Sequence, residues 1–386
     1  MACAEAGVKG PRSRGDPSIM NARDGLSLIP RGAAREWPFV SVVVPCRNER
    51  AHIEEMLQSV IQSGYPRERF EVIVADGMST DGTRAILDAA AARDGRIRVL
   101  DNHAGRKPEG LNAAIEAARG SVVVRMDAHS TYPPNYIPDC VAALIEFQAD
   151  NVGGVQASIP TSGDPLAQAI CLFYSGRLGL RRGRASAADR VPRPAETVYC
   201  GCFRRDVFSR FGWFDTRLTR GQDREFNARI RAHGGTILFL PWVEALYRPR
   251  TTMMAHARYM FLSGAVPFVA QSKVDTRLLS LRNKIAAATL PMTAAAAAFA
   301  VTTPILQVLG VVAGSAYLTA SLAGGVMAGA RGRSVAVGLW YPPVVWVSQS
   351  LYVCGAFIGA AGLSAAHVGR LVGKSNLDTR KSQQRT

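Results

Sequence analysis

Four short apolar runs in the first third of the chain, rich in β-branched residues, predict strands: Phe39–Pro45, Phe70–Ala75, Arg96–Leu100 and Ser121–Met126. The segments between them carry apolar residues at helical spacing and predict helices over Ile53–Ile61, over Arg84–Ala92 and from Pro108, a residue suited to a helix's first turn. Strands that alternate with helices indicate a parallel sheet with right-handed winding. The fold to about residue 240 is therefore expected to be α/β.

The C-terminal third has a different pattern. From Ile285 to Ala330 there are 46 residues without Asp, Glu, Lys or Arg, and from Ser334 to Gly369 there are 36 more. A bilayer crossing needs about 20 apolar residues. The first stretch can hold two crossings and the second at least one, so we expect about three transmembrane helices. The alternative is a buried helical bundle in a soluble domain, although cores rarely run this long without charge.

These patterns divide the chain into five segments. Residues 1–36 are rich in Arg, Gly, Pro and Ala, lack periodicity and predict a disordered basic leader; with no apolar core they fit a signal peptide poorly. Residues 37–245 form the expected catalytic domain. Residues 246–284 form an amphipathic connector whose stretch Met253–Ala270 could lie in the membrane interface or pack as a core helix. Transmembrane helices over 285–369 and a basic tail over 370–386 follow.

The formal net charge is +16. The chain has no basic motif with interspersed aromatic residues, so we expect no nucleic-acid partner. Basic residues beside spans mark the cytoplasmic side and attract anionic headgroups. The charge therefore indicates contact with membrane lipids and with phosphate-bearing substrates.

Seven cysteines are scattered along the chain. An odd number without a regular framework suggests a reducing compartment. Cys200-Gly-Cys202 has no second pair to complete a zinc site, and we interpret its cysteines as two small, buried residues that flank a turn.

Three acidic clusters carry candidate chemistry. Asp76 directly follows the second predicted strand, Asp127 follows the fourth, and Asp223 opens a later helical pattern. Carboxylates at the carboxyl ends of strands lie at the crevice where α/β sheets bind ligands. This pattern is typical of an enzyme that uses a nucleotide-activated donor.

The residues after each strand resemble the motifs of the family 2 glycosyltransferases, which are inverting enzymes with the GT-A (nucleotide-diphospho-sugar transferase) fold, a Rossmann-like sheet. The resemblance covers about residues 38 to 245. It rests on Pro45-Cys-Arg-Asn48-Glu49, on the three acidic clusters, and on Gly-Arg106-Lys107-Pro-Glu-Gly-Leu-Asn112. Asp127-Ala-His129 and the trailing spans are most similar to succinoglycan-type exopolysaccharide glucosyltransferases.

The resemblance implies a set of donor-binding residues. They serve the nucleoside, most often with uracil as its base, or the diphosphate: Pro45, Asn48, Glu49, Asp76, Asp81, Arg106, Lys107, Asn112 and Asp127. Three have simpler alternatives. Asp81 could cap a helix, the Arg106–Lys107 pair could be a solvated basic turn, and Asn112 could be a structural contact.

Asp127-Ala-His129 stands where the family usually has Asp-x-Asp. A divalent ion, Mn²⁺ or Mg²⁺, would neutralise the departing diphosphate, with Asp127 as a hard oxygen ligand. His129 is the departure from the pattern, and an imidazole prefers borderline ions such as manganese over magnesium. It could bind the metal directly or donate to a phosphate.

Inversion needs a base that takes the proton from the acceptor hydroxyl. Asp223 matches the Asp of the family's Glu-Asp motif; Gln222 replaces the Glu, and Glu225 is at most a helper. Carboxylates in a helix's first turn are also favoured by the helix dipole, so a structural role is the alternative.

The Gln-x-x-Arg-Trp motif of processive synthases is missing before the spans, so we expect transfer of a single sugar. The predicted protein is a plasma-membrane, multi-pass transferase with a cytoplasmic catalytic domain. It would move a sugar, most often from a UDP donor, to a polyprenyl-linked or polysaccharide acceptor in exopolysaccharide synthesis. A dolichol-phosphate-type polyprenyl-phosphate glycosyltransferase is the alternative. A transporter would carry charged groups within its spans, and a nucleotide-binding regulator would not need Asp223.

Overall fold

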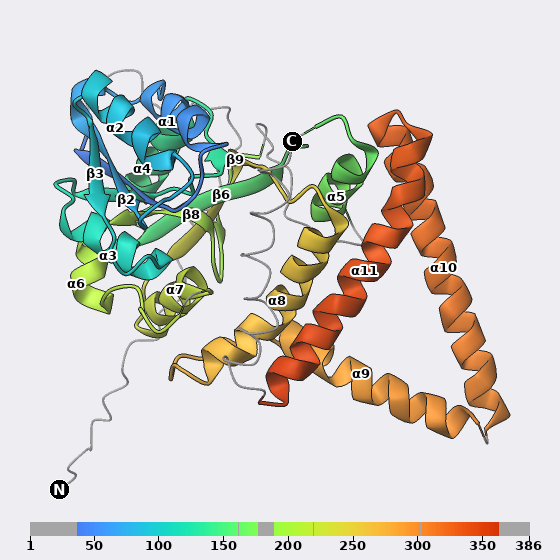
Figure 1. The fold of residues 1–386 in the computed structure, drawn as a ribbon. Coiled ribbons are helices and arrows are strands. Elements are labelled where there is room, and N and C mark those ends of the chain that lie inside the picture. Colours follow the sequence, from blue (N-terminus) through green and yellow to red (C-terminus); the bar gives the residue numbers. More distant parts are fainter. Residues whose placement is uncertain (1–36, 161, 177–188, 219, 302, 363–386) are drawn as a thin grey trace, which may run out of the picture. The chain divides into compact units, whose positions relative to one another are not determined.

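The computed structural model describes residues 37–160, 162–176, 189–218, 220–301 and 303–362 (Figure 1). The predicted leader and basic tail lie outside these residues. The described strands form one sheet, with the order β3-β2-β1-β4-β8-β6-β9-β5 and with β7 paired to β9. Their bounds are β1 Val40–Cys46, β2 Phe70–Asp76, β3 Ile97–Asp101, β4 Val122–Arg125, β5 Ser130–Thr131, β6 Asn151–Ser158, β7 Arg193–Pro194, β8 Tyr199–Arg204 and β9 Ile237–Tyr247.

The first half of the sheet confirms the prediction from the apolar runs. β1 lies between β2 and β4 and is parallel to both, and β3 extends the sheet beyond β2, also in parallel. β1, β2 and β4 are buried on both faces because helices cover them, which is why they are mostly apolar runs, whereas the edge strand β3 is only partly buried. The connecting helices are α1 Ile53–Ile61, α2 Thr83–Arg93 and α3 Lys107–Glu116, with a single 3₁₀ turn, η2 Arg67–Arg69, before β2.

The second half corrects the expectation of a purely parallel sheet. β8 is antiparallel to both β4 and β6, and β5 and β7 are antiparallel to β9, whereas β6 and β9 are parallel. The regular alternation of strand and helix that indicates parallel pairing ends near Met126, so strand direction beyond it was not visible in the pattern. Cys200 and Cys202 are also corrected: they are buried as expected, but they lie within β8 and flank no turn.

Aromatic residues join the two halves of the domain beneath the sheet. Phe203 on β8 meets Phe208, Phe214 and Phe226 with ring centroids 5.6, 6.4 and 5.7 Å away. Leu111 of α3 belongs to the same buried cluster. The remaining helices of the domain are α4 Tyr136–Glu146, α5 Pro165–Ser175, α6 Asp206–Phe211 and α7 Gln222–Ala232. This packing fixes α7, which carries Asp223, against the sheet.

Four helices follow β9: α8 Met253–Gln271, α9 Leu281–Ala300, α10 Pro304–Gly332 and α11 Val335–Ala360. α8 and α11 lie side by side (Figure 1) and approach closely at glycines. A Cβ added at Gly355 would lie 2.0 Å from the carbonyl oxygen of Phe261, and one at Gly264 would lie 2.1 Å from that of Tyr352. Small residues therefore set this helix spacing, as they do between membrane helices.

Two helices in the described part of the chain, α10 and α11, are long and apolar enough to cross a bilayer, judged by length and composition. α9 does not meet that test, so two of the three expected crossings have this support. α10 is almost entirely exposed, including Ile305, Val308, Leu309, Val311 and Val312. The core helix of a soluble domain would be mostly buried, so this exposure favours lipid around α10.

Candidate active site

The carboxyl ends of β1, β2 and β4 meet at one edge of the sheet. Cys46 at the end of β1 pairs with Asp76 at the end of β2, and Val43 pairs with Arg125 of β4. The loops that follow these strands therefore lie together, as expected for the binding crevice of an α/β sheet.

Asp76 anchors the first part of this edge. Its carboxylate is almost fully buried and accepts a 2.5 Å hydrogen bond from the Ser79 hydroxyl. The backbone N–H of Asn48 donates to the same hydroxyl at 2.9 Å, and the Asn48 side-chain oxygen accepts from the N–H of Thr80 at 2.8 Å. Asn48 adopts a left-handed conformation with φ of 54°, which asparagine tolerates better than most residues. The loops after β1 and β2 are thus tied together around Asp76.

Asp81 is engaged within the second loop. Its carboxylate accepts from the Thr83 hydroxyl at 2.6 Å, from the Thr83 N–H at 3.0 Å and from the Arg50 N–H at 3.2 Å. These contacts match the alternative of a helix-capping turn at the start of α2, and they also brace the loop after β1.

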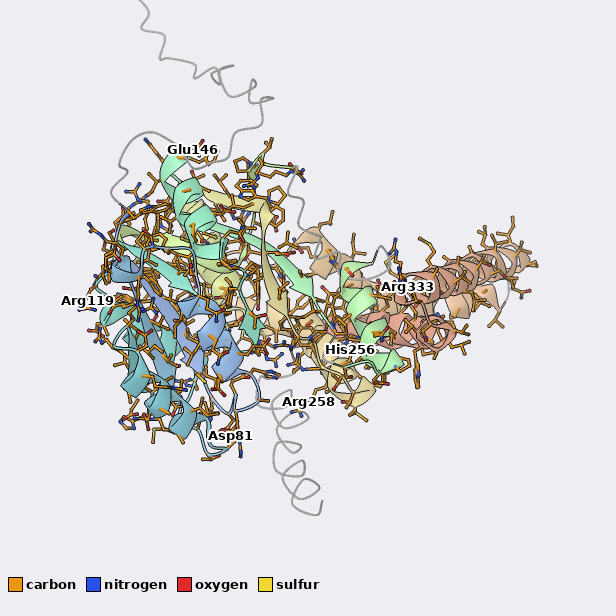
Figure 2. The ribbon with its side chains drawn as sticks, turned by 90° about the horizontal axis from the view of Figure 1, so that it is seen from above. Asp81, Arg119, Glu146, His256, Arg258 and Arg333 are labelled. Carbon is orange, nitrogen blue, oxygen red and sulfur yellow. The ribbon has the colours of Figure 1, made fainter. Side chains whose placement is uncertain are left out.

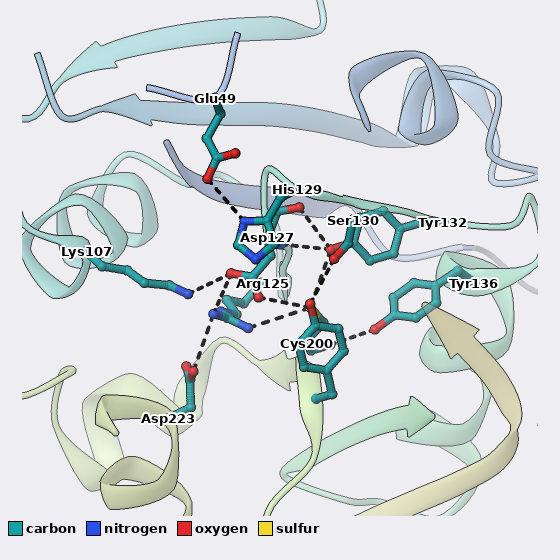
Figure 3. A network of polar contacts seen from close by, with 11 residues as sticks. Glu49, Lys107, Arg125, Asp127, His129, Ser130, Tyr132, Tyr136, Cys200 and Asp223 are labelled. Atoms are coloured by element: carbon teal, nitrogen blue, oxygen red, sulfur yellow. Dashed lines mark hydrogen bonds and ion pairs between the residues drawn. The ribbon is translucent and has the colours of Figure 1, made fainter. Parts of the chain in front are cut away.

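Asp127 is the centre of a charged network (Figure 3). Its Oδ1 accepts from Lys107 Nζ at 2.6 Å and from Arg125 Nη2 at 2.8 Å. Burial alone would raise the pKa of the Asp127 carboxyl, but the positive charges of Arg125 and Lys107 outweigh it and hold the pKa well below its usual range. Asp127 is therefore ionised at any physiological pH.

Arg125 is a site residue that the sequence analysis missed. Its side chain is 4% exposed, and Nη2 contacts both Asp127 and, at 3.3 Å, Oδ2 of Asp223. Figure 3 shows its guanidinium between the two carboxylates. Arg125 could have been identified from the sequence, since it is a lone basic residue inside the apolar run Ser121–Met126. Buried arginines are rare unless they are paired, so an arginine in a predicted buried strand indicates an acidic partner.

His129 faces Glu49 across the edge of the sheet, with 3.1 Å between Nδ1 and Oε1 (Figure 3). An ionised carboxylate can only accept, so this contact places the ring proton on Nδ1 and leaves Nε2 with its lone pair when the ring is neutral. A carboxylate that orients a histidine in this way is a common arrangement behind metal-ligating imidazoles.

The side chains of Asp127 and His129 have ligand atoms that are suited to a divalent ion. Asp127 offers an ionised oxygen and His129 an oriented imidazole nitrogen, which suit manganese. No group of three or more His, Cys, Asp and Glu side chains gathers at metal-binding spacing among the described residues. A bound ion would therefore draw its other ligands from the donor diphosphate and water, which is usual where the metal accompanies a phosphate substrate.

Asp223 lies in the first turn of α7 and reaches the network from the opposite side to Glu49 (Figure 3). Its side chain is 36% exposed, so one face is held by Arg125 and the other is open to solvent. This is the exposure that a group acting on an incoming substrate requires.

The chain matches known proteins over this same region. Residues 41–212 match the family model described as glycosyl transferase family 2. These residues form a family 2 glycosyltransferase domain. The match spans β1 to the end of α6 and so includes Asp76, Lys107 and Asp127.

Several curated relatives share this domain. The succinoglycan biosynthesis protein ExoA of Rhizobium meliloti is 30% identical over 55% of this chain and 64% of its own length. An undecaprenyl-phosphate 4-deoxy-4-formamido-L-arabinose transferase of Pseudomonas savastanoi is 34% identical over 32% of this chain and 38% of its own length. The chain thus spans less than two thirds of these relatives.

The solved structure of a mannosyltransferase from Pyrobaculum calidifontis, in complex with GDP-Man and Mn²⁺, superposes with a TM-score of 0.57. It covers 85% of this chain and 88% of its own, at 20% identity. This similarity confirms the GT-A fold.

Three residues assigned from the resemblance make structural contacts in the glycosyltransferase domain. Both polar ends of the Asn112 side chain bond to the backbone of Phe214, at 2.9 and 3.1 Å. Glu225 is buried in an ion pair with Arg229 at 2.8 Å. Arg106 pairs with Glu109 in the first turn of α3. Asn112 and Glu225 are held outside the network around Asp127, whereas half-exposed Arg106 neighbours Lys107.

Proposed function

We propose that this chain is a membrane-bound inverting glycosyltransferase. It would move a single sugar from a nucleotide-sugar to a lipid-linked or glycan acceptor in the synthesis of a bacterial exopolysaccharide or other cell-surface polysaccharide. The observation that carries this proposal is the bridge of Arg125 between Asp127 and Asp223. It joins the residues assigned to the donor diphosphate and to the acceptor in one network. The family 2 domain and the succinoglycan relative support the same reaction class.

In this scheme Asp223 accepts the proton of the acceptor hydroxyl. The hydroxyl oxygen forms a bond to the anomeric carbon from one face while the bond from that carbon to the diphosphate breaks on the other face. The products are an inverted glycoside and a nucleoside diphosphate. Arg125 positions the Asp223 carboxylate by holding one of its oxygens at 3.3 Å, which keeps the base in place before the acceptor arrives.

The leaving diphosphate needs positive charge. Lys107 begins α3, and its ammonium lies 2.6 Å from Asp127, where it can turn toward a phosphate oxygen. The helix N-terminus adds unpaired N–H groups that favour an anion. A divalent ion held by Asp127 and His129 would supply further neutralisation of the diphosphate. The mannosyltransferase of the same fold contains Mn²⁺ beside GDP-Man, which supports this assignment.

We assign the nucleoside to the edge formed by Pro45, Asn48, Glu49 and Asp76, with Asp76 accepting from the base. UDP is our proposed nucleotide. In the structure the Ser79 hydroxyl bonds Oδ1 of Asp76 at 2.5 Å, and Oδ2 has only longer contacts, 3.4 Å from the Ser79 N–H and 3.9 Å from Arg84. Asp81 supports this pocket through its contacts with Arg50 and Thr83.

A donor screen tests the reaction. Membranes that contain the full chain are incubated with UDP-, GDP- and dTDP-sugars carrying a labelled sugar, with Mn²⁺ present. We expect transfer of label to lipid-extractable or polymeric material from one donor class. Membranes with Asp223→Asn serve as the control. Donor consumption that is equal in both membranes, or absent from both with every donor, contradicts the proposal.

A polyprenyl-phosphate glycosyltransferase is the second candidate, because one relative is named as an undecaprenyl-phosphate 4-deoxy-4-formamido-L-arabinose transferase. The two candidates differ in the acceptor atom. A polyprenyl-phosphate glycosyltransferase transfers the sugar to a phosphate oxygen, whereas the enzyme of the first proposal transfers it to a sugar hydroxyl. Adding undecaprenyl phosphate alone distinguishes them, since only the second candidate would form a sugar phosphate with it.

We place the catalytic domain on the cytoplasmic side of the plasma membrane, with the helices after residue 284 crossing it more than once. Nucleotide-sugars are made in the cytosol, so the donor edge must face it. All six cysteines among the described residues are unpaired, in keeping with a reducing compartment.

A further inference from the structure

Three arginines gather where the catalytic domain passes into α8. Arg220 lies in the loop before α7 and Arg250 in the segment between β9 and α8. Arg258 lies on the second turn of α8, near His256 (Figure 2). We call this set the arginine cluster. The guanidinium of Arg250 stacks over the Tyr259 ring at 4.5 Å and donates a long, 3.5 Å contact to the Tyr247 hydroxyl.

The members of the arginine cluster are close enough to affect one another. The surrounding protein, and then the positive charges of Arg250 and Arg258, lower the pKa of Arg220. The Arg220 side chain is nevertheless exposed to solvent. Like charges held close together repel each other, and an anion bound between them removes that repulsion.

Arginines elsewhere in the domain have carboxylate partners, for example Arg84, Arg96, Arg98, Arg125, Arg210, Arg229 and Arg248. Within the described residues, no ion pair includes Arg220 or Arg250. The charges of these two guanidinium groups are thus not neutralised by a carboxylate of the described residues. Arginine suits phosphate especially well, because its planar fork donates two parallel hydrogen bonds.

The arginine cluster also borders the proposed reaction centre. Tyr247, which receives the contact from Arg250, has its ring 5.6 Å from that of His129. Arg220 precedes the candidate base Asp223 by three positions. On its other side α8 packs along α11, one of the two helices apolar enough to cross a bilayer. The cluster therefore lies between Asp223 and the membrane-crossing region.

We infer that the arginine cluster binds the phosphate or diphosphate group of a lipid-linked acceptor. The inference rests on the proposed function and names the acceptor's anchoring group. Phosphate could also arrive with the donor, but that diphosphate is assigned to Lys107 and Asp127 at the end of β4. Because α8 packs along α11, a lipid carrier bound beside α11 would also lie next to α8, and binding of its phosphate there would orient the attached acceptor toward Asp223.

The test measures binding, so it does not depend on turnover. The full-length protein in phosphatidylcholine nanodiscs is titrated with undecaprenyl phosphate, with undecaprenol as the uncharged match, and with UDP plus Mn²⁺ as the donor probe. Arg220→Gln and Arg250→Gln should each weaken undecaprenyl phosphate binding about tenfold, the loss of one charge-assisted contact. Undecaprenol and UDP binding should stay within about twofold. Arg93→Gln, which removes an exposed charge from α2, should change none of the three.

Three results overturn the inference: unchanged undecaprenyl phosphate binding, an equal loss of UDP binding, or an equal loss of binding when phosphatidylglycerol is titrated in place of undecaprenyl phosphate. The second assigns the arginines to the donor and the third to bulk lipid. Arg250→Lys keeps the charge and loses the fork, so partial retention with that variant separates a phosphate contact from misfolding. If no donor is ever consumed while the arginine-dependent binding persists, the proposed reaction fails and the phosphate site stands.

Discussion

Single charged residues decide what this site can do. Arg125 is buried and holds two carboxylates from different parts of the chain, Asp127 at 2.8 Å and Asp223 at 3.3 Å. Burial would lower its pKa, but the two carboxylates raise it well above the usual value, so the guanidinium stays charged. Removing one member of a buried charge network leaves the others unpaired and is costly. We therefore regard Arg125 as a positioning residue of the site.

Asp223→Asn keeps the volume of the side chain and removes the proton acceptor. We expect turnover to fall by about two to four decades. Donor binding should change little, since Asp223 contacts Arg125 and solvent in the structure. Transfer rates and UDP-sugar affinity of the purified protein measure the two effects. Asp88→Asn, an exposed carboxylate on α2, is the matched control. Near-normal turnover of Asp223→Asn would move the base elsewhere.

The metal assignment makes a second prediction at this scale. Asp127→Ala should abolish transfer and weaken donor binding in the presence of Mn²⁺, because it removes the only ionised oxygen of the Asp127–His129 pair. His129→Asp replaces an imidazole with a hard oxygen and should shift the preference toward Mg²⁺. Donor binding and transfer measured across a series of both ions provide the check. Full activity in excess chelator would contradict a metal-dependent reaction.

Among the elements, α8 connects the catalytic domain to the helices that follow. Its buried His256 donates through Nε2 to the Ser348 hydroxyl of α11 at 2.6 Å, because Ser348 gives its own proton to the carbonyl of Val344. Nδ1 is then left to accept from the Tyr174 hydroxyl of α5, 3.4 Å away. Burial, and then the charge of Arg250, lower the pKa of His256 from 6.5 to about 4. The neutral ring therefore joins three helices.

This shift predicts a pH dependence. The unfolded state binds the His256 proton below about pH 6.5, whereas the folded state resists it to about pH 4. The contribution of the neutral ring to the free energy of unfolding is present in full above pH 6.5. It is lost as the pH falls toward 4, by about 3 kcal/mol in total. We expect the melting temperature in detergent to fall between pH 7.5 and 5, and to fall less in His256→Gln, which keeps a donor for Ser348. Equal pH dependence in both proteins would rule out His256 as the cause.

For the whole molecule, the number of membrane crossings determines on which side of the bilayer the C-terminal tail lies. Three crossings by α9, α10 and α11 would return Arg331 and Arg333 to the cytoplasm, as the positive-inside rule favours, and would leave the tail after Gly369 outside. α10 and α11 have the required length and composition, whereas α9 does not pass that test. The count therefore depends on α9.

We keep the three-crossing prediction and test it with single cysteines placed after Gly369. An impermeant thiol reagent should label them in intact cells. A cysteine at Asp88, in the catalytic domain, should react only after lysis and serves as the control. If the tail also reacts only after lysis, α10 and α11 form a hairpin and α9 does not cross.

The parallel half of the sheet and the residues that follow its strands could be predicted from local sequence patterns. An apolar run buried on both faces leaves a local pattern, and so does a helix that packs on it, so β1 to β4 and α1 to α3 were predictable within a few residues. The family 2 motifs then placed Asp76, Asp127 and Asp223 in a common region. The apolar length of the C-terminal third predicted its helices for the same local reason.

The contacts between residues far apart in the chain could not be predicted, because they depend on how the strands and helices pack. The antiparallel placement of β8 brings Cys200 beside Asp127, and α7 brings Asp223 to Arg125, across about 100 positions of the chain. Asn112 and Glu225 fitted the motifs, but Phe214 and Arg229 hold them in structural contacts. Such contacts depend on strand direction and helix packing. Strand direction and helix packing are set by the burial of apolar side chains from many segments together, so no single segment carries a periodic pattern that reveals them.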